Sequence, residues 1–339
     1  MSLYTRIIDL GAFGLISGAK LLMMSYPSGS LTLVNASHQS DGFGAQFQRI
    51  LSIKALADSL KIQFRLEPLR QIERQLTQKH LPVEEHIKEI EAFNVFLESL
   101  FASSAKVKDS DVSSYFVDTL PQMFLTLLRS FLPVLFLKKK IEVRIENAYR
   151  FIQFNANLYS KLEYNHKAIE KIESNDEIKI SVHLRFVNFA TNTERYLDPD
   201  YYYESLNQIT RKLNHLGIRY KINLHSDFKE ALPTPSKLGI SKSTFEYLVN
   251  IGVSGQDGEV DLDTFNRAIE CKTRIIREYE NVIEIEANDP LSSLKVMANS
   301  DYLILSKSSF AFVAGVLNKK GQIISPEYWN LPLNNWNEI

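Results

Sequence analysis

Polar residues at alternate positions near the end of an apolar segment are the strongest candidates for chemistry in this chain. Residues 178–185, Ile-Lys-Ile-Ser-Val-His-Leu-Arg, alternate in the way that is typical of a β-strand. Ser181, His183 and Arg185 would share one face, because strand side chains repeat every two residues. A guanidinium and an imidazole at the C-terminal end of such a strand lie where open α/β sheets bind ligands. An edge strand with a solvated polar face would show the same pattern, so this segment alone leaves both interpretations open.

A serine-rich turn is a candidate for phosphate binding. The apolar segment 303–305 leads through Ser306, Ser308 and Ser309 into a helix predicted to begin near Phe310. Free N–H groups at a helix N-terminus, together with the helix dipole, attract phosphate. Simple N-capping explains one serine well but three less well, and the pattern therefore favours phosphate contact.

Three further positions fall between a predicted strand and a predicted helix. The glycine-containing loop 41–44 would let a ligand approach the backbone closely. Asp227 ends one predicted strand, and Asp289 precedes a predicted helix that it could simply cap. Asp41 is a candidate base from its position alone.

Composition excludes several classes of protein. The 339 residues carry a formal net charge of −1, so nothing indicates a nucleic-acid partner, and the basic run 138–140 is better explained as a solvated helix end. Cys271 is the only cysteine, which excludes an internal disulfide and fits a cytoplasmic location. Residues 7–24 are apolar but interrupted by charges, and could form a helix that contacts a membrane surface.

The order of predicted elements indicates an α/β protein with two halves. Residues 31–35, 46–60 and 62–66 read as strand, helix and strand, which is one βαβ unit. Residues 68–172 are predicted to be helical. After a linker at 174–176, strands alternate with helices to the end of the chain, and this order predicts a parallel, doubly wound sheet. The strands of this second half are predicted at 178–185, 220–225, 282–285, 302–305 and 322–324, and its helices at 199–216, 265–276, 291–299 and 310–317.

Together, these segments resemble the fucosyltransferase superfamily that includes bacterial α-1,2- and α-1,6-fucosyltransferases and protein O-fucosyltransferases. The His-x-Arg motif of that family is similar to His183-Leu-Arg185, and its Gly-x-Gly-Asn-Gln loop is similar to residues 42–46. The similarity covers residues 31–64 and 178–329 in collinear order. Further matches are Tyr196-Leu-Asp-Pro-Asp-Tyr-Tyr-Tyr203, Ser226-Asp227, Asp289 with Leu294 and Met297, Ser308-Ser309-Phe310, and Pro326-Glu-Tyr-Trp329.

The resemblance implies a GT-B fold, in which two Rossmann-like domains face each other across a cleft. We place the N-terminal α/β domain, with a helical acceptor-side region, at 1–175 and the nucleotide-sugar-binding domain at 176–339. It also implies sugar transfer, with fucose from GDP-fucose, to a glycan acceptor without metal or other cofactor. Arg185 would offset the negative charge of the leaving diphosphate as a catalytic residue, with Asp41 as the candidate base. The donor-binding residues implied in this way are His183, Arg185, Gly42, Phe43, Gly44, Asp227, Asp289, Ser308, Ser309 and Phe310.

Alternatives of other classes remain open. Phe186 and Asn188 stand where many family members have Arg and Asp, so a catalytically inactive GT-B-like protein that binds a nucleotide-sugar is the second hypothesis. A GT-A enzyme would need an Asp-x-Asp metal site, but none of the three such spacings, at 109–111, 198–200 and 261–263, follows an apolar strand. Another nucleotide-dependent α/β enzyme is disfavoured, because Gly-x-x-x-x-Gly-Lys and Gly-x-Gly-x-x-Gly loops are absent.

Overall fold

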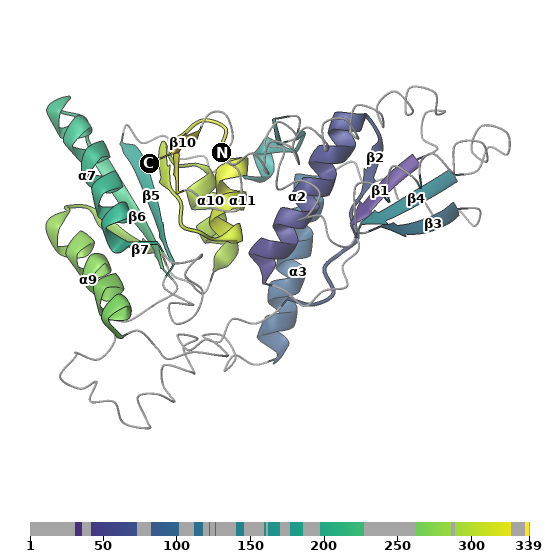
Figure 1. Ribbon diagram of the computed structural model, residues 1–339, viewed down its shortest axis with the longest axis horizontal. Helices are drawn as coiled ribbons and strands as arrows, with labels where there is room; N and C mark the ends of the chain where they lie inside the picture. Colours follow the sequence, from purple (N-terminus) through teal and green to yellow (C-terminus); the bar gives the residue numbers. More distant parts are fainter. Residues whose placement is uncertain are drawn as a thin grey trace. The chain divides into compact units, whose positions relative to one another are not determined.

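The computed structural model divides the chain into two compact units, and most of their helices and strands are labelled in Figure 1. Described residues up to Ala168, apart from Val83, form the first unit, and those from Ile169 onward form the second. The predicted linker at 174–176 lies outside the described residues. The described residues are 31–35, 42–72, 83–101, 112–117, 122, 126, 140–145, 159–160, 162–169, 177–185, 197–226, 262–285, 289–326 and 336–338.

The first unit contains a parallel four-stranded sheet in the order β2-β1-β4-β3. Its predicted βαβ unit is confirmed, since a helix lies between two parallel neighbouring strands. The elements are β1 (Leu31–Asn35), α2 (Phe43–Leu60), β2 (Gln63–Arg65), α3 (Val83–Leu100), β3 (Val112–Val117), β4 (Lys140–Ile145) and a 3-10 turn, His166–Ala168.

Aromatic side chains form much of the core of this unit. Phe43 stacks on Phe93, with ring centroids 3.4 Å apart, and Phe47 meets Phe96 edge to face at 5.9 Å. All four rings are buried. The aromatic stripe of α3 therefore builds the core, as its helical spacing predicts.

The prediction of a helical region over 68–172 is wrong in two places, because β3 and β4 are strands. In β4, Ile141, Val143 and Ile145 are buried while charged residues alternate with them. That period of two is a strand pattern. It also places Lys140 at the start of a strand rather than at a helix end.

The second unit contains a parallel six-stranded sheet in the order β10-β9-β8-β5-β6-β7. Its predicted alternation is confirmed, with β10 as an addition that the sequence did not indicate. The elements are β5 (Ile178–Leu184), α7 (Pro199–His215), β6 (Tyr220–Ser226), α9 (Leu262–Glu278), β7 (Val282–Ile285), α10 (Pro290–Ala298), β8 (Tyr302–Ile304), α11 (Ser309–Leu317), β9 (Gln322–Ser325) and β10 (Trp336–Glu338).

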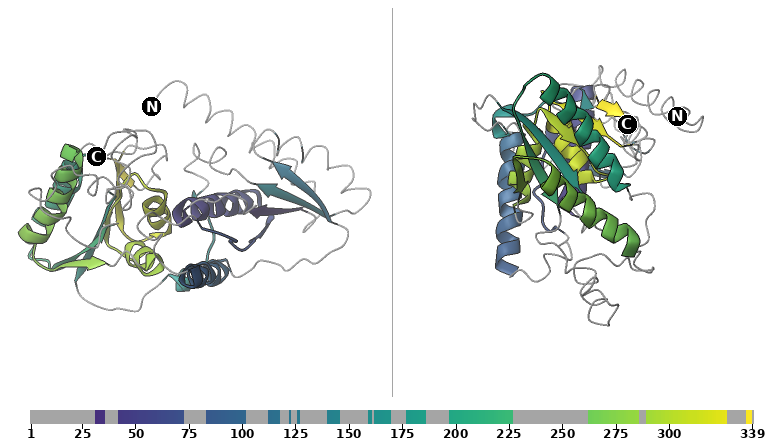
Figure 2. Two further views of the ribbon diagram at one scale, coloured as in Figure 1. Left: turned by 90° about the horizontal axis from the view of Figure 1, so that it is seen from below. Right: turned by 90° about the vertical axis from the view of Figure 1, so that its left-hand side faces the viewer.

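Helices pack in pairs around this second sheet. The views in Figures 1 and 2 agree that α7 lies beside α9 and that α10 lies beside α11. Strand β5 is hydrogen-bonded to β6 on one side and to β8 on the other, so the edge-strand interpretation of this segment is wrong. The hydrophobic core beside this strand includes Ile180, Val182 and Leu184 of β5, and Tyr202 and Leu206 of α7.

No helix among the described residues combines the length and the apolar character needed to cross a bilayer. Residues 7–24, for which membrane contact was predicted, lie outside the described part of the chain.

Candidate functional site

The strand order of the second sheet fixes where a ligand would bind. The chain runs from β5 to β6 on one side and from β8 to β9 on the other, so β5 and β8 flank the point where the winding direction reverses. In open α/β sheets, ligands bind outside the carboxyl ends of the strands at this switch point. His183 and Arg185 lie at the end of β5, while Ser306 and Ser308 follow β8, so the two sequence candidates meet at that position.

A buried hydrogen bond joins the two strand ends. His183 Nδ1 lies 2.7 Å from Ser306 Oγ, and both side chains are buried. Burial, assisted by the neighbouring Arg185 guanidinium, lowers the pKa of His183 to about 3. The imidazole is therefore neutral near pH 7 and offers hydrogen bonds without charge. Its ring centroid is 5.9 Å from that of Phe310, which lies in the first turn of α11.

A second hydrogen bond holds the Arg185 guanidinium in place. Arg185 Nη1 donates to Ser308 Oγ at 3.0 Å, and the same oxygen accepts from the Phe310 N–H at 3.2 Å. Ser308 is thus the N-cap of α11, and its hydroxyl hydrogen has no acceptor within the described part of the chain. Arg185 Nε is buried and also lacks a partner among the described residues. Unused donors consequently converge at a helix N-terminus, which is an arrangement suited to an anion.

A neutral polar cluster lies next to His183, and of its members the sequence indicated only Ser181. His225 of β6 bonds to Ser293 Oγ through Nδ1, at 3.1 Å, and to Ser181 Oγ through Nε2, at 3.3 Å. Ser300 donates to Ser181 at 2.6 Å, and all four residues are buried. Burial and the adjacent His183 lower the pKa of His225 to about 3. The cluster ties α10 to β5 and β6 without adding charge.

The other predicted site residues are divided between the two units. Asp289 caps α10 by accepting from Ser292 N–H at 2.9 Å, and Ser309 is the half-buried first residue of α11. Gly42, Phe43 and Gly44 begin α2 in the first unit, where the Phe43 ring is packed in the core. The remaining predicted residues, Asp41 and Asp227, lie outside the described part of the chain.

Two residues considered for other chemistry have structural roles. Asp198 caps α7 by accepting from Asp200 N–H at 3.0 Å. Cys271 is buried, and burial raises the pKa of its thiol to about 12, so it is a poor nucleophile. Among the described residues, no group of three or more His, Cys, Asp or Glu side chains is arranged to hold a metal ion.

Comparison with known proteins gives structural likenesses only. No protein-family model and no curated protein sequence matches the chain. POFUT1 in complex with GDP is 11% identical, with 90% of this chain and 100% of that chain covered and a TM-score of 0.40. The α-1,6-fucosyltransferase NodZ, soaked with GDP-fucose, is 10% identical, with 86% and 93% covered and a TM-score of 0.34. The E. coli heptosyltransferase WaaC, with ADP-2-deoxy-2-fluoro heptose, is 10% identical, with 91% and 92% covered and a TM-score of 0.37. Likenesses this low leave the activity to be inferred from the chain's own residues.

Proposed function

We propose that this chain is a glycosyltransferase that transfers a sugar from a nucleotide-sugar donor to a glycan acceptor without a metal ion. The observation that carries the proposal is the Arg185–Ser308 pair at the switch point between β5 and β8, at the N-terminus of α11. The sequence resemblance around His183-Leu-Arg185 points to GDP-fucose as the donor.

The chemistry of the departing group explains why these residues would suffice. When the sugar–oxygen bond breaks, negative charge develops on the nucleoside diphosphate, and fixed positive potential lowers the barrier. Arg185 supplies a permanent charge on a forked group that matches phosphate oxygens. The Ser308 hydroxyl and the first turn of α11 would add neutral donors.

The two units would then correspond to the two Rossmann-like domains of a GT-B enzyme, facing across a cleft, with the donor in the second domain. In this assignment 1–175 and 176–339 are the domains. Separate parallel sheets in the two units support it.

A calorimetric screen tests the proposal. Purified protein is titrated with GDP, UDP, CMP and their sugar conjugates in the presence of EDTA, and GDP release from GDP-fucose is then followed with and without glycan acceptors. We expect the GDP series to bind and GDP-fucose to be consumed. Binding without transfer or hydrolysis would support the inactive nucleotide-sugar-binding alternative, and binding by none of the nucleotides would contradict both.

A further inference from the structure

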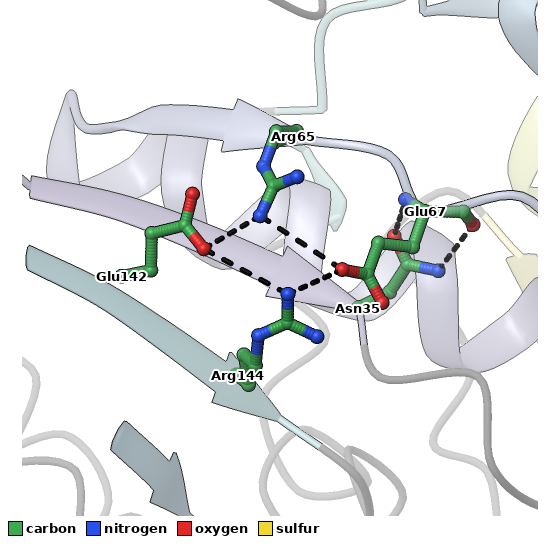
Figure 3. Close-up of polar contacts among 5 residues, drawn as sticks. All are labelled: Asn35, Arg65, Glu67, Glu142 and Arg144. Carbon is green, nitrogen blue, oxygen red and sulfur yellow. Dashed lines mark hydrogen bonds and ion pairs between the residues drawn. The ribbon is translucent and has the colours of Figure 1, made fainter. Parts of the chain in front are cut away.

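A network of four charged side chains lies toward the carboxyl ends of the first sheet (Figure 3). Arg65 Nη2 is 2.6 Å from Glu142 Oε2 and 3.8 Å from Glu67 Oε1. Arg144 Nη2 is 2.7 Å from Glu67 Oε1 and 3.9 Å from Glu142 Oε2. We call these four residues the charge quartet. They come from β2, β4 and the segment that follows β2, so the fold assembles them from distant parts of the chain.

Asn35, at the end of β1, fixes one corner of the charge quartet. Its Oδ1 accepts from the Glu67 N–H at 2.8 Å, and its Nδ2 donates to the Glu67 carbonyl at 2.9 Å. Asn35 is buried, so this two-bond clamp holds the backbone of Glu67 in place. The clamp thereby fixes the backbone position from which the Glu67 side chain reaches the two arginines.

The charge quartet keeps unused hydrogen-bonding capacity. Each guanidinium contacts the carboxylates only through Nη2, and each carboxylate makes these contacts through a single oxygen. Within the described part of the chain, the remaining nitrogens of Arg65 and Arg144 have no partner. Arg65 Nε is buried and out of reach of a ligand, whereas the other three nitrogens are not buried. The second oxygens of Glu67 and Glu142 are likewise without a described partner. Donors and acceptors are therefore available side by side.

The charges of the quartet cancel, and this selects the class of ligand. Two cations paired with two anions leave little net attraction for a phosphate or a carboxylate. A sugar hydroxyl instead both donates and accepts, so neighbouring hydroxyls can bridge a guanidinium and a carboxylate. The two arginine side chains are each 21% exposed, which leaves them within reach of such a ligand.

An aromatic ring adjoins the charge quartet on the same face of the sheet. Phe116 of β3 is paired in register with Arg144, whose Cζ lies 5.7 Å from the ring centroid. The Phe116 side chain is 59% exposed, so a flat apolar surface stands beside the polar groups. Polar groups that orient a ligand next to an aromatic surface are typical of small-molecule sites.

We propose that the charge quartet and Phe116 form a binding site for a neutral, hydroxyl-rich saccharide, which is the acceptor glycan of the reaction proposed above. This inference rests on the proposed function for the identity of the ligand, but the site itself is assigned from residues of the first unit. The competing explanation is that the quartet only stabilises the sheet.

Two pairs of variants separate the explanations. Glu142→Gln removes one charge of the quartet, whereas Asp58→Asn removes a partly buried carboxylate of the same unit that pairs with Lys54 in α2. Phe116→Ala removes the exposed ring, whereas Tyr115→Ala removes a half-exposed ring from the opposite face of the same strand. Because Phe116 is exposed, its variant tests the site even if Glu142→Gln folds poorly.

The full chain and its variants are tested by saturation-transfer NMR and titration with maltotriose, cellotetraose, lactose, mannotriose and trigalacturonate. We expect at least one neutral saccharide to bind more tightly than the acidic one, with a loss of about tenfold or more in Glu142→Gln and Phe116→Ala. Asp58→Asn and Tyr115→Ala should bind like the unaltered chain. Failure of every neutral saccharide to bind, a preference for trigalacturonate, or unchanged binding in both site variants would overturn the inference. GDP titration of the same proteins reports on the second unit, so loss of nucleotide binding alone would count against the proposed function and not against this site.

Discussion

The carboxyl ends of the strands form a polar edge in each of the two sheets, and the charges of the side chains at these two edges differ. In the first unit, two guanidinium groups are matched by two carboxylates. In the second, Arg185 is bonded to the Ser308 hydroxyl, and the neutral His183 and His225 are each bonded to a serine nearby. Among the described residues, Arg185 has no carboxylate partner. The two proposals above rest on this difference, because a lone cation favours an anion while a balanced set of charges favours a neutral polar molecule.

The largest effect that we expect is a loss of stability on acidification, caused by the buried histidines of the second unit. The folded pKa values of His183 and His225, about 3, lie below the usual 6.5, so the unfolded chain binds more protons between these values. The contribution of these two histidines to the free energy of unfolding is therefore fully present above pH 6.5. It is lost as the pH falls toward 3, by up to about 1.4 kcal/mol per pH unit for each histidine.

Denaturant titrations from pH 7 to pH 5 measure this effect. With Trp329→Phe as background, Trp336 is the only tryptophan and is buried in the second unit. His225→Gln should reduce the slope, whereas His215→Gln, an exposed position in α7, should leave it unchanged. Equal slopes in all three proteins would contradict the neutral, buried state of His225.

The next effect distinguishes capping from ligand contact at the second edge. Ser308→Ala removes the N-cap of α11 and the acceptor of Arg185, so we expect a loss of about 1 kcal/mol in stability and a clear loss of nucleotide affinity. Ser309→Ala should lower nucleotide affinity by about tenfold with stability intact, because Ser309 is not the cap. Thermal melting and nucleotide titration of both variants measure the two quantities. Undiminished affinity in both would leave Ser308 with a capping role only.

The smallest effect concerns the stability of the charge quartet. A double-mutant cycle with Arg144→Met and Glu67→Gln should give a coupling free energy of about 1 kcal/mol, because the pair is only partly buried. Hydrogen exchange of peptides that cover β2 and β4 measures this coupling free energy at the two strands, and the coupling should become smaller in high salt. A coupling near zero at low salt would mean that the quartet does not act as a unit.

The sequence predicts the second unit better than the first, for physical reasons. Strands β5 to β9 are short segments rich in apolar residues, and the helices α7, α10 and α11 begin at a capping residue, so the signals for these elements are local. Strand β4 does carry a local period of two, which the helical interpretation of the surrounding apolar sequence overlooked. Strand β3 has no regular alternation and is defined by its pairing with β4. β10 has three residues and too little pattern to predict.

The same reason explains what could be predicted of each site. The candidates at the second edge stand at strand ends, where their position is visible in the sequence, although His183 and Ser306 are 123 residues apart. The charge quartet has no local motif, since Arg65 and Glu142 are 77 residues apart and each resembles an ordinary surface charge. Only the register of β2, β1 and β4 brings them together.

The central claim, that Arg185 is the cation of a nucleotide-sugar site, is tested most directly by calorimetric titration of GDP into Arg185→Lys. As a matched control, Arg219→Lys makes the same change at an exposed position just before β6, at the opposite edge of the same sheet. Lysine keeps the charge but loses the fork, so we predict an affinity about 10-fold to 150-fold lower for Arg185→Lys and unchanged affinity for Arg219→Lys. Equal GDP affinity in Arg185→Lys, Arg185→Ala and the unaltered chain would contradict the account.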